Sequence, residues 1–392
     1  MKKLIKYTIG VDVAKDKLDI CLMSVDVELL HKIKSTRKIS NSPAGFKDLL
    51  GWIEKHCREN VPVQILMEAS GVYHEKLAIH LTEKGKTVFV VLPNKAHKYM
   101  QSLGQKTKND KVDAQGLALM CAQQKFDVWQ PIGKFYYQLR LLTRYYQGTQ
   151  QARTVFLNQL HALKHSGYTS KVVSKQLERT IALFEKQIKE TRKNITKHIN
   201  SNEEVKRKVS QVCQIKGVDI LTVATLLAET NGFELFKNMA QVVSYAGYDV
   251  IENQSGQHTG KTRISKKGNP RIRRILHMPA FNVVRFNETP FVNLYERVFS
   301  TTKIKMKAYV AVQKKILVVI YALWKKDQAY QTDYTIQKQT SGNDEPKALF
   351  SFFTEESVVK SIKKVVPPKG STTLDELQYN ESPKALFSLL QT

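Results

Sequence analysis

The sequence predicts a chain of two kinds of structure, an α/β domain followed by a mainly helical region. Three observations indicate this arrangement. Short apolar runs separated by glycine, proline and charged turns fill residues 5–92, as in a sheet with covering helices. From Tyr136 to about Asn200, apolar residues recur at helical spacing. Beyond residue 205, more helical segments flank a basic stretch, and 392 residues suffice for several cores.

The first 130 residues predict strands and helices in the order β-β-β-α-β-α-β-α. The predicted strands are Tyr7–Val13, Leu18–Ser24, Leu29–Ser35, Val63–Met67 and Thr87–Leu92. The predicted helices are Ser42–His56, Tyr73–Lys84 and Asp110–Gln124. Gly85 ends the second helix, which is the usual place for glycine at a helix C-terminus. This order is that of a ribonuclease-H-like sheet, so we expect that fold in residues 1–130.

Residues 131–204 predict a helical coiled-coil region. Apolar residues of its second half recur at steps of three, four and seven residues, which is the spacing of a coiled-coil seam. They are Val173, Leu177, Ile181, Phe184, Ile188, Ile195 and Ile199. The segment His165–Tyr168 predicts the turn between two helices. The pattern fits both a hairpin that dimerises and one that packs on its own domain, and the polar remaining faces slightly favour the dimer.

Residues 205–330 predict a second compact unit. Its expected helices are Thr222–Glu229, Met239–Tyr245 and Tyr309–Trp324, and its basic stretch spans 253–274. The remaining residues, 331–392, are polar and carry the hexapeptide Pro-Lys-Ala-Leu-Phe-Ser twice, at 346–351 and 383–388. Two copies are too few for a solenoid. We therefore interpret 331–392 as an accessory or docking tail.

The charge balance predicts a polyanionic partner. The chain has 62 Lys and Arg residues against 35 Asp and Glu residues, a formal net charge of +27. So large an excess repels itself in a compact fold, whereas beside nucleic acid it releases condensed counterions and favours binding. The composition therefore favours a nucleic-acid-binding protein.

The cysteines and the hydropathy pattern exclude other classes. Cys21, Cys57, Cys121 and Cys213 form no CxxC pair, which argues against a zinc site and against a disulfide framework. No apolar run approaches the roughly 20 residues of a membrane span. The N-terminal lysines meet Asp12 before a signal-peptide core could form. We expect a soluble, cytoplasmic protein with no membrane partner.

Four carboxylates predict a metal centre. Asp12 lies within a buried strand, Glu68 ends an apolar run, and Asp110 and Asp113 begin a predicted helix three residues apart. Carboxylates gathered at strand ends would repel one another unless cations lay between them. Mg²⁺ prefers oxygen ligands, and two ions about 4 Å apart stabilise an in-line phosphoryl displacement. Singly, each residue has a structural alternative: Asp110 as a helix N-cap, Asp12 as a turn cap and Glu68 as an ion-pair partner.

Several motifs carry a family resemblance. In the N-terminal half they are Gly10–Asp16 (GVDVAKD), Glu68–Tyr73 (EASGVY) and Lys108–Ala114 (KNDKVDA). In the C-terminal half they are Tyr245–Gly247 (YAG), Gln254–Gly256 (QSG), Ile264–Asn269 (ISKKGN) and Ala311–Leu317 (AVQKKIL). In this order, over roughly residues 5 to 330, the chain resembles transposases of the insertion-sequence one-ten family, a group that includes the Piv DNA invertase.

The resemblance implies a RuvC-like domain, a coiled coil and a transposase domain. It assigns the family's DEDD set to Asp12, Glu68, Asp110 and Asp113, with Mg²⁺ as cofactor, and its catalytic serine to Ser255. It also implies double-stranded donor and target DNA, a structured guide RNA encoded by the element, and a homo-oligomer, dimer or tetramer, that shares its active centre between protomers. The chain departs from the family at Asp219 and Val250, where relatives often have glycine and proline.

The stretch around Ser255 is strongly basic. No acidic residue occurs between Asn253 and Asn287, and Gly256 and Gly260 let the backbone approach DNA closely. The cations expected to hold phosphate are Lys261, Arg263, Lys266, Lys267, Arg271, Arg273 and Arg274. Charge and spacing alone do not select Ser255 over Ser265, and His258 is either a proton carrier or a bystander.

Two other functions stay open at this level. One is a RuvC-like junction resolvase or nuclease, in which the carboxylates cut and the basic region only binds. The other is a non-catalytic nucleic-acid-binding protein, against which the presence of all four carboxylates weighs. Transposition and site-specific inversion use the same centre, so the sequence does not distinguish them.

Overall fold

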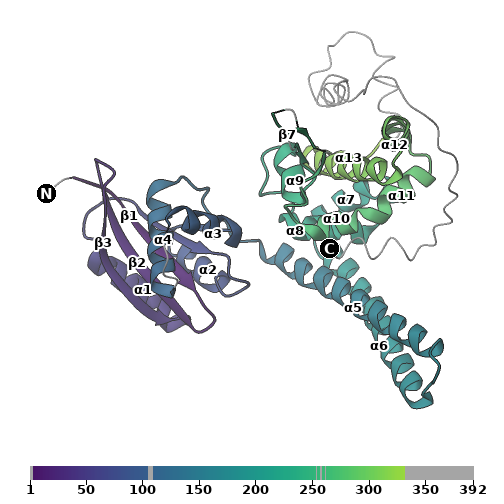
Figure 1. Cartoon of the computed structure of the whole chain (residues 1–392), viewed down its shortest axis with the longest axis horizontal. Coiled ribbons are helices and arrows are strands. Elements are labelled where there is room, and N and C mark those ends of the chain that lie inside the picture. The colour runs from purple at the N-terminus through teal and green to yellow at the C-terminus, as the bar shows by residue number, and fades with distance from the viewer. Residues whose placement is uncertain (1–2, 105–108, 253, 257, 261, 332–392) are drawn as a thin grey trace, which may run out of the picture. The chain divides into compact units, whose positions relative to one another are not determined.

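The computed structural model describes residues 3–104, 109–252, 254–256, 258–260 and 262–331, and its N-terminal part is built on a five-stranded sheet (Figure 1). The strands are β1 (Leu4–Val13), β2 (Lys17–Asp26), β3 (His31–Ser40), β4 (Val63–Glu68) and β5 (Thr87–Val91). Their order is β3-β2-β1-β4-β5, with β2 antiparallel to both neighbours and β1, β4 and β5 parallel. This confirms the predicted ribonuclease-H-like sheet.

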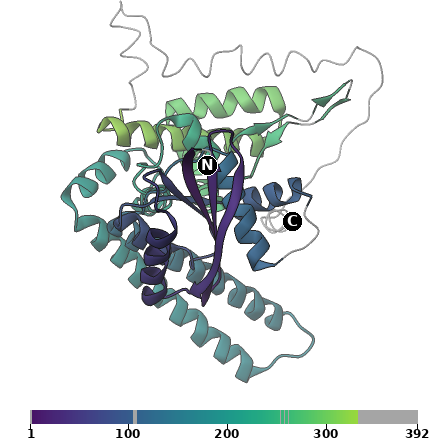
Figure 2. The same cartoon turned by 90° about the vertical axis from the view of Figure 1, so that its left-hand side faces the viewer.

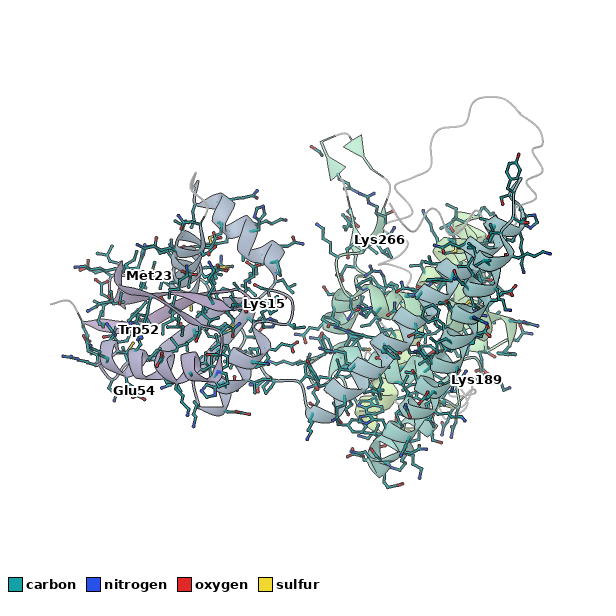
Figure 3. The ribbon with its side chains drawn as sticks, turned by 90° about the horizontal axis from the view of Figure 1, so that it is seen from below. Lys15, Met23, Trp52, Glu54, Lys189 and Lys266 are labelled. Atoms are coloured by element: carbon teal, nitrogen blue, oxygen red, sulfur yellow. The ribbon has the colours of Figure 1, made fainter. Side chains whose placement is uncertain are left out.

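Helices cover both faces of this sheet. On one face, α1 (Pro43–His56) and α2 (Glu75–Glu83) pack on alternate strand residues such as Ile9 and Val11. On the other face lie α3 (Pro93–Ser102) and α4 (Asp110–Gln123). Figure 3 labels one residue from each side: Trp52 of α1 in the first core, and Met23 of β2 in the core beneath α4.

Gly10 sets the distance between α4 and the sheet. A Cβ atom at this position would lie 2.1 Å from the carbonyl oxygen of Ala114 and 2.2 Å from the backbone nitrogen of Ala118. Any larger side chain would therefore push the helix off β1. The absence of a side chain at Gly10 lets the α4 backbone lie directly on the strand.

Two long helices, α5 (Lys134–Lys164) and α6 (Lys171–Asn200), lie side by side as a hairpin (Figures 1 and 2). The connecting residues include the turn that the sequence predicts. Ile195 and Ile199 at the base of the hairpin are buried and join the core of the C-terminal helices. Val173, near the tip, is 43% exposed. The apolar stripe of α6 is thus part of an intramolecular core at one end and open at the other.

The C-terminal helices share one core with the base of this hairpin. They are α7 (Glu203–Val212), α8 (Ile220–Thr230), α9 (Met239–Ala246), α10 (Pro270–Ile275), α11 (His277–Arg285), α12 (Thr289–Thr302) and α13 (Lys305–Lys326). Val312, Ile316 and Ile320 of α13 are fully buried in it. Two short ladders stand between α9 and α10: β6 (Val250–Ile251) with β9 (Arg263–Ile264), and β7 (Gln254–Ser255) with β8 (His258–Thr259).

The prediction from sequence is incomplete at several elements. The third strand begins at His31 rather than Leu29 and extends to Ser40. Helices α3, α7, α10, α11 and α12 were not predicted. The repeat-bearing tail lies outside the described residues. Within the part of the chain that the structure describes, no helix has the length and apolar character to cross a membrane.

Replacing Gly10 with alanine tests the packing of α4 on β1. The added Cβ meets backbone atoms that cannot rotate away, so we expect Gly10→Ala to lower the free energy of unfolding by about 2 to 3 kcal/mol. The matched control is Gly51→Ala in α1, where a Cβ would meet nothing within 4 Å; it should be neutral or slightly stabilising. Urea unfolding followed by circular dichroism measures both, and equal effects would contradict the interpretation.

Candidate active site

The register of the sheet brings Asp12 and Glu68 to the face that α4 covers. Gly10 is paired with Leu66 of β4, and Leu66 packs in the core beneath α4. Side chains two residues apart on a strand share a face. Asp12 and Glu68 each lie two residues further along, so both carboxylates project toward α4 at the carboxyl ends of β1 and β4.

Helix α4 begins at the same end of the sheet. The side chain of Asn109 caps it by accepting a hydrogen bond from the backbone nitrogen of Val112, at 2.9 Å. Because Asn109 is the N-cap, the alternative of Asp110 as N-cap is wrong. Asp110 and Asp113 both lie in the first turn of α4. The next residue, Ala114, faces the sheet and packs against β2. The first turn of α4 therefore carries its two carboxylates to the strand ends.

The four predicted carboxylates act on one another electrostatically. Burial, followed by the negative charges of Asp110, Asp113, Asp19 and Glu68, raises the pKa of Asp12 to about 6. Burial is the largest cause of this rise, and the acids add to it through their charge. Glu68, Asp110 and Asp113 therefore lie within electrostatic range of Asp12, as the sequence predicts.

Asp19 is a fifth carboxylate, which was not among the site residues predicted from the sequence. It is directly opposite Asp12 in the antiparallel pairing of β1 and β2, which places both side chains on the same face. The sequence contains a pattern that could have predicted this position. Asp19 belongs to an alternating strand that follows a short turn after Asp12 and returns beside it. Its carboxylate is 3.5 Å from Nζ of Lys38, its partner in the pairing of β2 with β3.

A second lysine also reaches the acids. Nζ of Lys17, the first residue of β2, donates a hydrogen bond to Oδ2 of Asp110 and forms an ion pair with it. This hydrogen bond holds the pKa of Asp110 below its usual range. The acids of the site are therefore partly balanced by cations that the chain itself supplies.

The donor set suits a hard divalent cation. Every candidate ligand is a carboxylate oxygen, the type that Mg²⁺ prefers. Among the described residues, no three His, Cys, Asp or Glu side chains form a group that could ligate one ion. The carboxylates influence the ionisation of Asp12 through their charge. Their side chains would have to rotate to ligate one ion together.

Ser255 lies on an exposed two-stranded ladder. Its backbone pairs with that of His258 across a turn containing Gly256, whose φ of 55° is in the left-handed region that favours glycine. Ser255 itself is exposed. Gly256 thus permits the tight turn that presents the serine to solvent.

Ser265, the alternative serine, has a structural role. Its hydroxyl oxygen accepts a hydrogen bond from the backbone nitrogen of Lys267, at 3.2 Å. Its own backbone nitrogen donates to the carbonyl oxygen of Asp249, at 2.7 Å. These bonds shape the loop before α10, which favours Ser255 as the serine that is open to a ligand.

The predicted phosphate-binding cations fall into two groups. Arg263, Lys266, Lys267 and Arg274 are exposed, and Figure 3 labels Lys266 near the base of the ladders. Arg271 and Arg273 have partners inside the protein. Arg271 donates to Oε1 of Gln147 at 3.0 Å, and Arg273 donates to the carbonyl oxygen of Ala246 at 2.7 Å. Lys261 lies outside the described residues.

A buried glutamate anchors this basic loop. Glu229 of α8 has a side chain only 1% exposed, and it accepts two hydrogen bonds from Arg144 of α5, at 2.8 and 2.9 Å. Nδ2 of Asn269 donates to the same carboxylate at 2.8 Å, and Nε of Arg271 lies 3.7 Å from it. Burial raises the pKa of Glu229, but hydrogen bonds from Arg144 and Asn269 outweigh this and lower it below its usual range.

Asp219, where the family often has glycine, has a structural role. It is the N-cap residue of α8, and its carboxylate accepts a hydrogen bond from Arg192 of α6 at 2.9 Å. A negative charge at this helix N-terminus opposes the binding of a phosphate there. The chain therefore uses the position to join α8 to α6.

Removing the charge of Glu229 should destabilise the C-terminal core. We expect Glu229→Gln to lower the free energy of unfolding by about 2 kcal/mol, less than for a fully buried pair because the Arg144 side chain is 43% exposed. The control is Glu185→Gln, which removes an exposed ion pair with Arg153 and should cost less than about 0.5 kcal/mol. Chemical unfolding curves of the two variants give the comparison, and similar losses would refute the anchoring role.

Two solved structures resemble parts of this chain. Thermus thermophilus RuvC is 15% identical and covers 31% of this chain and 99% of its own, with a TM-score of 0.24. T. thermophilus RuvC in complex with a Holliday junction substrate is 14% identical and covers 32% and 84%, with a TM-score of 0.20.

Sequence comparisons cover far more of the chain. The pilin gene-inverting proteins of Moraxella bovis and Moraxella lacunata are each 28% identical over 327 residues, which is 83% of this chain and 98% of theirs. Residues 9–165, which include the four carboxylates, match a family model described as a transposase. Residues 209–296, which include Ser255, match the transposase IS116/IS110/IS902 family. The chain therefore belongs to this transposase family, the insertion-sequence one-ten family that its motifs resemble.

Proposed function

We propose that this transposase cuts and exchanges DNA strands with two sets of groups, the carboxylates near Asp12 and the hydroxyl of Ser255. The observation that supports the proposal is that Asp12 and Glu68 lie at the ends of neighbouring strands beside the first turn of α4, which carries Asp110 and Asp113. The raised pKa of Asp12 agrees with this placement. A partly buried carboxylate with a strongly shifted pKa is a common feature of functional sites. The assignment of Asp12, Glu68, Asp110 and Asp113 as catalytic follows the family motif.

The proposed cofactor is Mg²⁺, with two ions. Asp12, Glu68, Asp110 and Asp113 would hold them. When bound, the ions supply positive charge that stabilises the attacking and leaving oxygens of a phosphoryl transfer. The carboxylates would hold that charge at the strand ends of the sheet.

In the proposed covalent step, the oxygen of Ser255 attacks a phosphorus atom of the DNA backbone. A bond forms between Oγ and phosphorus and the bond from phosphorus to the 3′ oxygen breaks. The serine proton leaves to a base, and the 3′ oxygen takes up a proton. The products are a phosphoserine link and a free 3′-hydroxyl. The exposed cations Arg263, Lys266, Lys267 and Arg274 are suited to hold the phosphates beside it.

We further propose the partners that the family implies. These are double-stranded donor and target DNA, a structured guide RNA encoded by the element, and a dimer or tetramer whose active centre combines two protomers. The open tip of the α5–α6 hairpin, where Val173 and Tyr168 are exposed, supports a role in such assembly. With DNA as substrate, we expect the protein to act in the bacterial cytoplasm, at the nucleoid.

Site-specific inversion is a second candidate reaction. The two Moraxella relatives are named for inverting a pilin gene, and they match nearly their whole length to this chain. Excision and inversion need the same cutting and joining steps. Sequencing the DNA products from paired element ends separates them, since inversion leaves the intervening segment reversed in place.

Substituting Ser255 tests the covalent step. We expect Ser255→Ala to abolish the protein–DNA adduct seen on a denaturing gel and to lower strand exchange at least about 1000-fold. The matched control, Ser265→Ala, removes a hydroxyl that only shapes the loop and should keep the adduct. Continued DNA cutting by Ser255→Ala would favour the RuvC-like nuclease alternative and would refute the serine nucleophile.

The metal centre predicts how stability depends on pH. The pKa of Asp12 in the folded chain, about 6, lies above that of an unfolded aspartate, about 3.9. The fold therefore loses stability as pH rises from about 4 to about 6 and loses no more above that. Without divalent cations, Asp12→Asn should match the native chain at pH 4.

At pH 8, Asp12→Asn should be more stable than the native chain by about 1 kcal/mol, a value discounted for partial exposure. Adding Mg²⁺ at pH 8 should stabilise the native chain and remove this advantage, because the ions offset the repulsion. Urea unfolding at both pH values with and without Mg²⁺ measures the effect. No advantage at pH 8 without metal would contradict the gathered acids.

A further inference from the structure

Lys17 occupies a position next to one of the proposed metal ligands. Its Nζ donates a hydrogen bond to Oδ2 of Asp110. The two side chains are 44% and 48% exposed, so other ions can reach both of them. Before any divalent cation arrives, the ammonium group already balances the charge of Asp110.

Hydrogen bonds fix the backbone of Lys17, whereas its side chain can rotate. The carbonyl oxygen of Lys17 accepts a hydrogen bond from the nitrogen of Ala14 at 3.0 Å, which closes the turn between β1 and β2. Lys17 is also paired with Ser40 in the sheet. Because the backbone is fixed at the sheet end, only rotation of the side chain can move Nζ between Asp110 and another anion.

The ion pair of Lys17 with Asp110 should exchange readily. Exposed ion pairs contribute little to stability, because solvent screens the attraction and two long side chains lose freedom. A lysine ammonium is also a common ligand of phosphate groups. In the proposed function, the anion that comes to this site is the DNA backbone, so a phosphate can compete with Asp110 for Lys17.

We propose that Lys17 is a positioning residue that couples DNA binding to metal binding. In the free protein, Lys17 pairs with Asp110 and competes with a divalent cation for its oxygens. When a DNA phosphate takes Lys17, Asp110 becomes available as a ligand. Thermodynamic reciprocity then requires that metal also strengthen DNA binding by the same factor. The inference rests on the proposed metal centre.

Lys38 provides the matched comparison. It lies near the same acids and carries the same charge, and it has similar exposure to Lys17, but its partner is Asp19, at 3.5 Å. Asp19 is not one of the four family carboxylates. Removing Lys38 therefore changes the general field of the site without freeing a proposed ligand.

The test measures Mn²⁺ binding to the full-length protein by electron paramagnetic resonance of the free ion. Titrations are made with and without a 40-base-pair DNA duplex, and Mn²⁺ bound by the duplex alone is subtracted. The proteins are the native chain, Lys17→Met, Lys17→Arg and Lys38→Met. Lys17→Met keeps the length of the side chain and removes the charge, and circular dichroism checks that each variant is folded.

We expect DNA to increase the Mn²⁺ affinity of the native chain at least about 5-fold, a typical coupling between two sites. Lys17→Met should bind Mn²⁺ more tightly without DNA and should show less than about a 2-fold increase with DNA. Lys17→Arg and Lys38→Met should keep most of the increase. Native-like coupling in Lys17→Met would overturn the role of Lys17 and leave the metal centre standing, whereas no Mn²⁺ binding by any of the proteins would overturn both.

Discussion

The direct contact between α4 and β1 at Gly10 governs the geometry of the N-terminal site. With no side chain at this position, the helix backbone at Ala114 and Ala118 lies on the strand, and the first turn of α4 reaches the strand ends. Two of the four carboxylates come from the sheet and two from the helix. Their approach is therefore decided by a packing distance, and the electrostatic character of the site follows from it.

Placing several carboxylates near one another lowers the stability of the folded state. Each additional acid near Asp12 makes ionisation of that residue less favourable, and burial adds to the cost. Lys17 and Lys38 reduce the repulsion from the β2–β3 side. Proteins commonly accept unfavourable local interactions at functional sites and compensate for them elsewhere in the core. Here the fully buried residues of β1, including Ile9 and Val11, fix the strand that carries Asp12.

The sequence predicted the sheet and the four carboxylates because both depend on local patterns. Buried strands and an aspartate within one of them are recognisable without knowing what packs nearby. Asp19 was missed because its role arises from strand pairing, which places it opposite Asp12. Lys17 was missed because its partner, Asp110, comes from helix α4, far away in the sequence. Helices such as α7 were missed since their apolar residues are few, and their burial depends on α8 and α13. The partners of Glu229 come from α5 and from the loop before α10, which no local pattern connects.

The network around Glu229 has a consequence for how the basic loop should be studied. Arg271 and Arg273 lie in the same short stretch as Lys267, yet they donate their hydrogen bonds to Gln147 and Ala246. A mutational scan scored only by recombination would not distinguish the three residues, since a misfolded loop and a lost phosphate contact are equally inactive. Assays that report folding and DNA retention separately would divide the arginines that build the loop from the lysines that face solvent.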